Sequence, residues 1–423
     1  MRKGTRLVLV CCACSFFFAE AQAEAPAAVT AVTVSKIRII IDEREYEWTV
    51  LGQIEVSGKP ALKQELKPET IQSFLSVEPG MRSEPGTLEK RCREAELRLT
   101  GSGYFYASSV IIVPPKLNPA ERTIIVSVTS GYLWRYGGGN AWAMLGKEGL
   151  GGERAGLRLY AGWNRSGAEY MHYRVGGIPL VLGGRLFYFG PGENAGKAFS
   201  SVSDRFEASA TTGWLLHPDL MAGIDSVSSG FGPGSAGLVS FQPFASYKKF
   251  IERGVNSDAG CGLRFFWYPE SGKGKSEMNG YVHAGLSGRT VIAVSGSLGY
   301  SPEKLPKQAL FNLFYTEDRN VRSGYSKDEL TASSFALCSA ELRQTLATFT
   351  VPPAIDCRIQ TFLFADAAGL REKAGVARLR IADAFGAGLR ILFDNPVFAW
   401  FTFSYGINRE GSGRFLFCGT AGY

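Results

Sequence analysis

The residues with the clearest chemistry in this sequence are one arginine and two carboxylates. Arg322 lies late in the 423-residue chain, in the polar connection 320–325 between two amphipathic segments. A buried charge without a partner is very costly, so an arginine that leaves water here needs a carboxylate. Asp366 and Glu341 follow it in the sequence. We expect Arg322 to pair with Asp366 and also with Glu341.

Alternation along the neighbouring segments indicates which way these carboxylates point. Glu341 lies on the charged face of a strand predicted over 333–345, and Asp366 lies on the charged face of one predicted over 357–367. The opposite face of each strand holds residues that lipid tolerates. A transmembrane β-barrel with a polar lumen has this pattern, and so has a soluble sheet with one exposed face.

The N-terminus has the features of a secretory signal peptide. A basic start precedes an apolar run from Leu7 to Ala19, and two A-x-A sites follow. We predict a signal peptide over residues 1–23, with cleavage after Ala23 or Ala25. The alternative is lipid modification of a cysteine in this segment, at Cys11, Cys12 or Cys14.

Composition argues against several classes of function. The net charge is +7, but the basic residues are scattered and do not indicate a nucleic-acid surface. The cysteines beyond the signal peptide have no metal-like or paired spacing, and the three histidines are isolated. Motifs of phosphate-binding loops and nucleophile elbows are absent. We therefore expect no enzymatic activity, no cofactor, no metal site and no nucleic-acid partner.

The same composition is typical of an outer-membrane barrel. Beyond the signal peptide there is no run of about 18 apolar residues, which excludes a helical membrane protein. The chain has 51 glycines and 12% aromatic residues, and its mean hydropathy is close to zero. A barrel can have such values because only alternate residues of its strands need be apolar.

Residues 26–131 differ from the rest of the chain because they combine strands with helices. The predicted order is strand, strand, helix, helix, strand, strand, over 32–41, 48–56, a short helix from Pro68, 87–100, 105–113 and 122–129. Without its first strand this order is β-α-α-β-β. The strand at 32–41 either covers or extends the sheet, and the sequence leaves this open.

From residue 132 the helical period disappears and alternating segments separated by turn residues take its place. The predicted strands are 132–144, 154–163, 168–178, 183–190, 202–213, 218–229, 236–249, 258–268, 277–286, 289–299, 308–315, 333–345, 357–367, 381–392, 396–407 and 413–423. The expected fold is a transmembrane antiparallel β-barrel of about 16 strands over 132–423, preceded by a small α+β domain over 26–131. The strand count carries a margin of about two.

These features together resemble the BamA-like superfamily, also called the bacterial surface antigen family. Residues 26–131 are similar to a POTRA domain in their order of elements and in Gly103-Tyr104-Phe105 after the second helix. The segment 320–325 is similar to the Val-Arg-Gly-Phe/Tyr motif of the family's sixth extracellular loop, with one extra residue, Ser323. Asp366 resembles the Asp of the family's aromatic-x-Asp-x-Gly strand motif, with one extra alanine before Gly369. Glu341 stands where the preceding strand supplies its acidic partner.

The resemblance implies that this loop folds into the lumen and is locked there. The residues of the implied lock are Val321, Arg322, Gly324, Tyr325, Glu341 and Asp366. The extra Ser323 changes how the aromatic ring is aimed relative to the arginine, so Tyr325 matches the motif less well than Arg322 does.

The resemblance also implies a function without enzymatic chemistry. It implies an outer-membrane protein assembly or insertion factor, or a polypeptide translocator, in a diderm bacterium with the N-terminal domain in the periplasm. Such a protein captures clients through its POTRA domain and works through the seam between its first and last barrel strands. The residues of the implied seam and terminal strand are Gly137, Gly138, Gly139, Phe415, Phe417, Gly419 and Tyr423.

Two matters stay open at this point. The glycines at the seam either weaken strand pairing or relieve crowding on a curved wall. A passive outer-membrane pore, similar to a porin, or a surface antigen is the alternative function. The implied partners are unfolded outer-membrane or secreted polypeptides, periplasmic or lipoprotein accessory subunits, and outer-membrane lipid.

Overall fold

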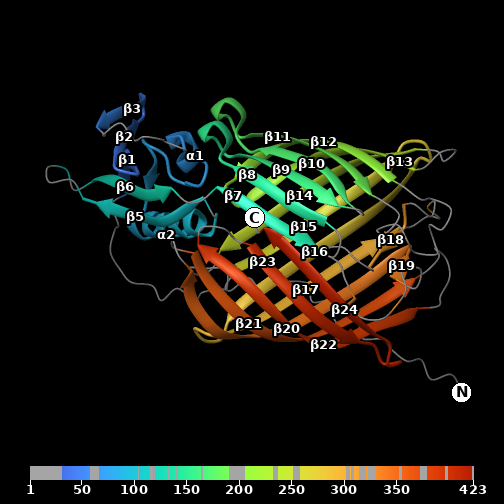
Figure 1. The fold of residues 1–423 in the computed structure, drawn as a ribbon. Helices are drawn as coiled ribbons and strands as arrows, with labels where there is room; N and C mark the ends of the chain where they lie inside the picture. Colours follow the sequence, from blue (N-terminus) through green and yellow to red (C-terminus); the bar gives the residue numbers. More distant parts are fainter. Residues whose placement is uncertain are drawn as a thin grey trace, which may run out of the picture.

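The structure is a computed structural model in which an α+β module lies at one end of a β-barrel (Figure 1). It describes residues 31–57, 66–102, 104–114, 118, 120–130, 133–139, 142–162, 165–189, 205–231, 237–250, 258–301, 305, 309–313, 321–322, 325, 330–351, 355–371, 379–395 and 399–421. The predicted signal peptide lies outside the described residues.

The module is built on a mixed sheet with the strand order β3-β2-β1-β6-β5. Its elements are β1 (Val32–Ile41), β2 (Arg44–Thr49), β3 (Gly52–Ser57), α1 (Pro68–Gln72), β4 (Arg82–Ser83), α2 (Pro85–Gly101), β5 (Phe105–Val113) and β6 (Glu121–Ser130). β4 pairs with one end of β1. None of the described helices has the length and apolar character needed to cross a bilayer.

The strand at 32–41, whose place the sequence left open, is the central strand of this sheet. β1 pairs with β2 in antiparallel fashion and with β6 in parallel fashion. The single strand predicted over 48–56 is wrong, because a hairpin turn divides this stretch between β2 and β3. Leu51, at that turn, is 99% exposed. The alternation in the sequence continues through the tight turn and conceals it.

The core of the module follows from two periodicities. Every second residue of β1 towards its end is buried, at Ile37, Ile39 and Ile41. α2 begins with Pro85 in its first turn, where the missing N–H costs nothing. Its buried stripe packs on the same face of the sheet and consists of Leu88, Cys92, Ala95 and Leu99.

The barrel is closed and antiparallel, and its described residues form sixteen strands. These are β7 (Trp134–Gly139), β8 (Trp142–Glu148), β9 (Ala155–Gly162), β10 (Ser166–His172), β11 (Leu180–Phe189), β12 (Arg205–His217), β13 (Leu220–Phe231), β14 (Leu238–Phe250), β15 (Asp258–Tyr268), β16 (Lys273–Gly285), β17 (Thr290–Tyr300), β20 (Ser334–Val351), β21 (Ile355–Arg371), β22 (Arg380–Asn395), β23 (Ala399–Ile407) and β24 (Gly413–Ala421). The predicted fold class and strand count are confirmed.

The count is right although two of the predicted strands are wrong. The predicted first strand, 132–144, contains all of the short β7 and the start of β8, which pairs with it. The predicted strand 308–315 is not part of the barrel. Only Phe311–Asn312 is extended there, as β18, and it pairs with β19 (Thr331–Ala332). The segment alternates because Phe311 and Leu313 are buried against other side chains, and not because it separates the lumen from lipid.

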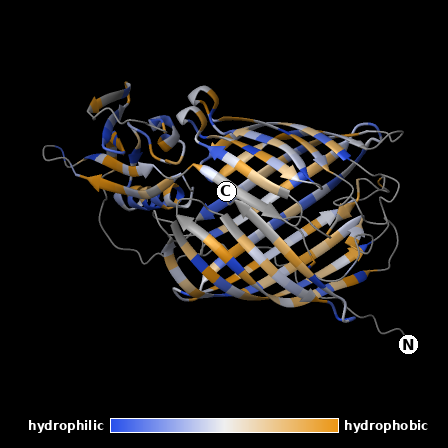
Figure 2. Cartoon of the chain, viewed as in Figure 1, coloured by the Kyte–Doolittle hydropathy of each residue, from blue (hydrophilic) through white to orange (hydrophobic). Residues whose placement is uncertain are grey.

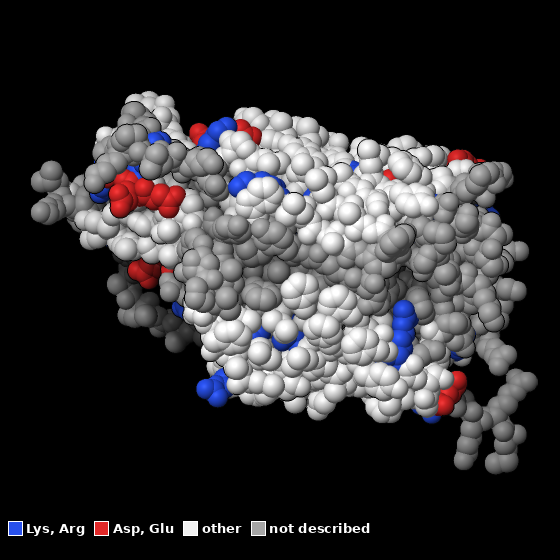
Figure 3. All heavy atoms as spheres, viewed as in Figure 1, with Lys and Arg blue, Asp and Glu red and all other residues white. Residues whose placement is uncertain are grey.

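The outer face of the barrel is apolar. Large hydrophobic residues exposed on the strands include Leu186, Phe206, Leu263, Leu298 and Leu363. Apolar residues alternate with polar ones along the strands (Figure 2), and the barrel wall shows few charges on the side drawn in Figure 3. This is the face that a transmembrane barrel turns towards lipid.

Ion pairs and an apolar anchor attach the module to the rim of the barrel. Arg98 of α2, whose side chain is 4% exposed, pairs with Asp219 between β12 and β13 at 2.6 Å. Glu94 of the same helix pairs with Lys249 of β14 at 3.1 Å. Leu133, directly before the first barrel strand, belongs to the core of the module. The module and this end of the barrel are therefore packed as one body.

Candidate functional site

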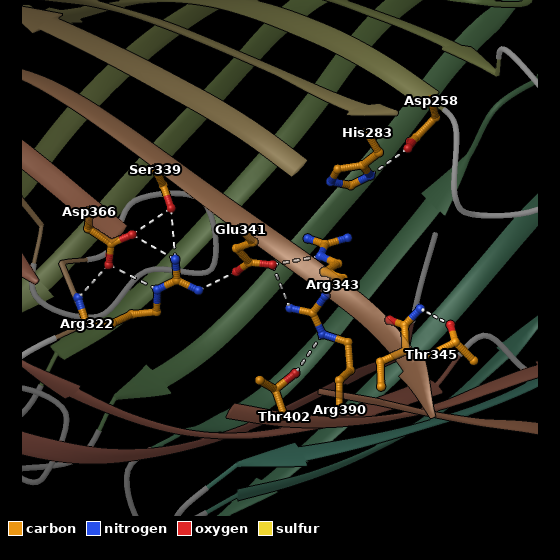
Figure 4. A network of polar contacts seen from close by, with 11 residues as sticks. Asp258, His283, Arg322, Ser339, Glu341, Arg343, Thr345, Asp366, Arg390 and Thr402 are labelled. Carbon is orange, nitrogen blue, oxygen red and sulfur yellow. Dashed lines mark hydrogen bonds and ion pairs between the residues drawn. The ribbon is translucent and has the colours of Figure 1, made fainter. Parts of the chain in front are cut away.

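The side chain of Arg322 points at the inner wall of the barrel and is enclosed by acceptors (Figure 4). Its Nε and Nη2 donate to the two carboxylate oxygens of Asp366, at 3.0 and 2.7 Å. Its backbone N–H donates to the same carboxylate at 3.0 Å. Nη1 donates to Glu341, and Nη2 also donates to the hydroxyl of Ser339 at 2.9 Å. The structure thus brings together the arginine and both predicted carboxylates.

Strand register explains why these acceptors converge. Ser339 on β20 stands directly opposite Asp366 on β21, and Glu341 stands opposite Phe364. Residues two apart on a strand share a face, so all four side chains point into the lumen. Ser339 donates to Asp366 at 2.6 Å, which fixes the carboxylate, and the guanidinium lies 3.9 Å from the centroid of the Phe364 ring. The side chain of Asp366 is fully buried and that of Arg322 is 14% exposed.

Two further arginines contact Glu341, and the sequence did not reveal their role. Arg343 Nε donates to Glu341 at 2.7 Å, and Arg390 Nη2 donates to the same carboxylate oxygen at 3.4 Å. Arg390 also donates to Thr402 of β23 at 3.2 Å. The signal for Arg343 is its place two residues after Glu341 on the same face. Arg390 comes from a separate strand, in the segment Gly386-Ala387-Gly388-Leu389-Arg390 that also resembles the BamA-like superfamily, but no local pattern pairs it with Glu341.

Tyr325 and Val321 fix the loop on either side of the arginine. The hydroxyl of Tyr325 donates to Asp383 of β22 at 3.0 Å, and the residue is 4% exposed. Val321 is 1% exposed in a cluster with Phe311, Leu313 and other apolar residues. Asp383 was not among the predicted site residues. Gly324 lies outside the described residues.

The part of the wall that faces Arg322 has glycines where the loop backbone approaches it. A Cβ atom on Gly406 of β23 would lie 1.6 Å from the carbonyl oxygen of Arg322 and 2.9 Å from the ring of Phe364. A Cβ on Gly386 of β22 would lie 2.8 Å from the same ring. Only glycine permits this close approach.

The first and last barrel strands meet along a very short seam. Among the described residues, β7 and β24 pair at Gly139 with Cys418 and at Gly138 with Gly419. Gly137 pairs with Met144 of β8, as its two neighbours also pair with β8, but the described residues of β24 give it no seam partner. Phe417 stacks on Phe403 of β23, with ring centroids 4.8 Å apart, and Phe415 is 59% exposed. Tyr423 lies outside the described residues.

A second feature lies on the module, as a groove between α2 and the edge strand β5. It has a volume of about 630 Å³ and is lined by Glu89, Cys92, Arg93, Glu96, Leu97, Val110, Ile111 and Ile112. Burial, with a smaller contribution from Glu89, raises the pKa of the Cys92 thiol to about 11. The thiol is therefore neutral at physiological pH and contributes an apolar wall. Among the residues described by the structure, no cluster of side chains could hold a metal ion.

Comparison with solved structures supports the architecture. CdiB from Escherichia coli superposes with a TM-score of 0.56 at 11% identity, over 95% of this chain and 92% of that chain. CdiB from Acinetobacter baumannii gives 0.55 at 11% identity, over 93% and 74%. BamA from Haemophilus ducreyi, lacking POTRA domains 1-3, gives 0.48 at 13% identity, over 91% and 84%. No protein-family model and no curated protein sequence matches the chain.

These comparisons define a fold. Since β7 begins at Trp134, a likeness over 95% of the chain extends well into the module. The chain has the fold of the CdiB barrels, and the fold expected from the sequence, a β-barrel preceded by a small α+β domain, is confirmed.

Proposed function

We propose that this chain assembles or translocates polypeptides in the outer membrane of a diderm bacterium, with its N-terminal module in the periplasm. The observation that carries the proposal is the seam. β24 pairs with β23 at nine residue pairs, from Ala399–Ala421 to Ile407–Gly413, but with β7 at two within the described residues. A barrel that served only as a rigid pore has no use for so weak a closure.

The seam supplies a physical mechanism. Backbone N–H and C=O groups cannot stay unsatisfied in the hydrocarbon of a bilayer. When β7 and β24 separate, their exposed ladder groups can be satisfied by a strand of a client polypeptide. Within the described residues only two residue pairs must separate first, so the cost of opening is small.

The module supports the same proposal as a POTRA-like domain that captures clients. Its sheet ends in β5 on one side, next to the groove along α2. An extended segment can add to such an edge through main-chain hydrogen bonds and place alternate side chains in the groove. Unfolded outer-membrane or secreted polypeptides are the partners that fit, and accessory subunits can use the other edge, β3.

Arg322 and its acceptors serve in this proposal as a lock on the loop between β17 and β20. Val321, Arg322 and Tyr325 hold the described part of the loop against β20, β21 and β22. A loop fixed in this way stabilises the wall at β20, β21 and β22 while the seam between β7 and β24 opens.

Two measurements made together test the proposal. Depletion of the protein should lower the amount of folded outer-membrane or secreted clients, and reconstituted protein should promote their assembly in vesicles. The purified protein should conduct ions weakly in planar bilayers. High open-pore conductance together with unchanged client levels on depletion would establish the passive pore instead.

A further inference from the structure

The loop between β17 and β20 contacts the lumen wall at a second place, on the side of β15 and β16. Lys275 of β16 is 7% exposed, and its Nζ donates to the carbonyl oxygen of Ala309 in the loop at 2.6 Å. The same ammonium lies 4.6 Å from the ring centroid of Phe266 on β15 and 4.3 Å from that of Phe311 in the loop. A charge on the wall is thus held between one ring of the wall and one ring of the loop.

This contact is suited to holding the loop firmly. A cation between two aromatic faces is attracted by both rings, and desolvation strengthens the attraction. Its hydrogen bond to a carbonyl is charge-assisted and so stronger than a neutral one. Around it lies a separate apolar cluster of Phe266, Tyr268, Leu305 and Ala309. Removal of the charge would leave Ala309 without this donor and the two rings without the cation between them.

The Lys275 contact and the Arg322 contact act on one folded piece of chain. Ala309 leads directly into β18, which pairs with β19. Leu313 donates its N–H to Leu330 at 3.0 Å and accepts one from Val321 at 3.1 Å. Val321 is followed by Arg322. Backbone hydrogen bonds therefore connect the two contacts, and Phe311 adds an edge-on contact to Phe335 of β20 at 5.0 Å.

The two contacts lie on different strands of the wall. In the closed barrel, β16, which carries Lys275, is separated by β17 from β20 and β21, which carry the acceptors of Arg322, and β22 and β23 follow beyond these. Figure 1 shows β18 and β19 near the end of the barrel away from the module. The described residues of the loop therefore connect two sectors of the inner wall at this end of the lumen.

We propose that Lys275 is a second anchor of this loop, and that the described residues of the loop obstruct the lumen to ions as long as either anchor holds. The proposal deepens the proposed function, on which it rests for the role of the loop, by adding a control that Arg322 alone does not exercise. In this arrangement the release of one anchor loosens the loop, and the release of both frees the lumen.

Conductance of the full-length purified protein in planar bilayers tests the proposal. The variants are Lys275→Met, Arg322→Ala and both together, each first checked for folding by heat-modifiable migration on gels. Each single change should raise the conductance slightly, and the pair should raise it to about fivefold that of either single variant, because anchors that substitute for each other are not additive. Lys275→Arg keeps a cation and a donor and should conduct like the wild type.

A matched control separates the anchor from a general effect of charge. Lys273→Met makes the same change two residues earlier on β16 and should leave the conductance unchanged. An equal rise with Lys273→Met, or a double variant that conducts no more than Arg322→Ala, would overturn the proposal. The measurement needs no client, so failure of client assembly in a separate assay would refute the proposed function and leave the second anchor standing.

Discussion

Arg322 donates three hydrogen bonds to Asp366, two from its guanidinium and one from its own backbone N–H. The backbone bond means that the carboxylate positions the loop itself and not only the end of a long side chain. The remaining guanidinium nitrogen is directed at Glu341, which Arg343 and Arg390 also contact. The loop is thus tied to a network that extends over β20, β21 and β22.

The first prediction concerns this pair. Arg322→Ala leaves the buried Asp366 without its arginine, and Asp366→Ala leaves Arg322 with Glu341 as the remaining one of its two carboxylates. Loss of a partner from a buried ion pair costs up to about 3–5 kcal/mol. Either variant should lower the temperature at which the loop becomes accessible to added protease and should reduce client assembly. The double variant should be little worse than either single one, because both remove the same interaction.

Two further variants sharpen this test. Arg322→Lys should rescue poorly, because lysine lacks the planar fork that reaches both oxygens of Asp366. Arg289→Ala, an exposed arginine in the turn between β16 and β17, is the control and should behave like the wild type. Strictly additive losses from Arg322→Ala and Asp366→Ala would contradict the pairing.

The second prediction concerns the space that the loop occupies. Gly406→Ala places a methyl group 1.6 Å from the carbonyl oxygen of Arg322, so the loop must move away from β23. We expect faster proteolysis of the loop with an intact barrel. Gly296→Ala on β17 is the matched control, because its new methyl meets nothing closer than 3.6 Å. Unchanged protection in Gly406→Ala would show that the loop does not depend on this approach.

The third prediction concerns client capture on the module. Successive N–H groups of an edge strand point alternately to its partner and to open space, so only one of Val110 and Ile111 offers its N–H to a client. Proline removes that donor. Of the variants Val110→Pro and Ile111→Pro, one should keep a folded module and lose client binding, measured by crosslinking to an unfolded outer-membrane polypeptide. Normal binding by both folded variants would exclude β5 as the receiving edge.

The sequence predicted those parts of the molecule that depend on local periodicity. Counting alternate residues placed Glu341 and Asp366 on the charged faces of their strands. The strand register brings Ser339 opposite Asp366, and these faces point towards Arg322. The barrel was predictable for the same reason, since lipid on one side and a polar lumen on the other impose a period of two.

Parts that depend on the packing of distant segments were not predictable. Arg390 reaches Glu341 from another strand, and Gly406 is needed only because the loop lies against it. The segment 308–315 alternates like a barrel strand because a buried loop also separates apolar from polar residues. The seam is short because of the register between the first and last barrel strands, and a local sequence pattern does not predict that register.

The central claim is that the seam between β7 and β24 must open. Cys418 already stands opposite Gly139 across it, so Gly139→Cys can close the seam with a single disulfide. Gly280→Cys is the matched control, because Gly280 of β16 stands opposite Cys261 of β15, away from the seam. Oxidised Gly139→Cys should lose client assembly and regain it on reduction, while oxidised Gly280→Cys stays active. Full activity of Gly139→Cys with its disulfide formed would contradict the account.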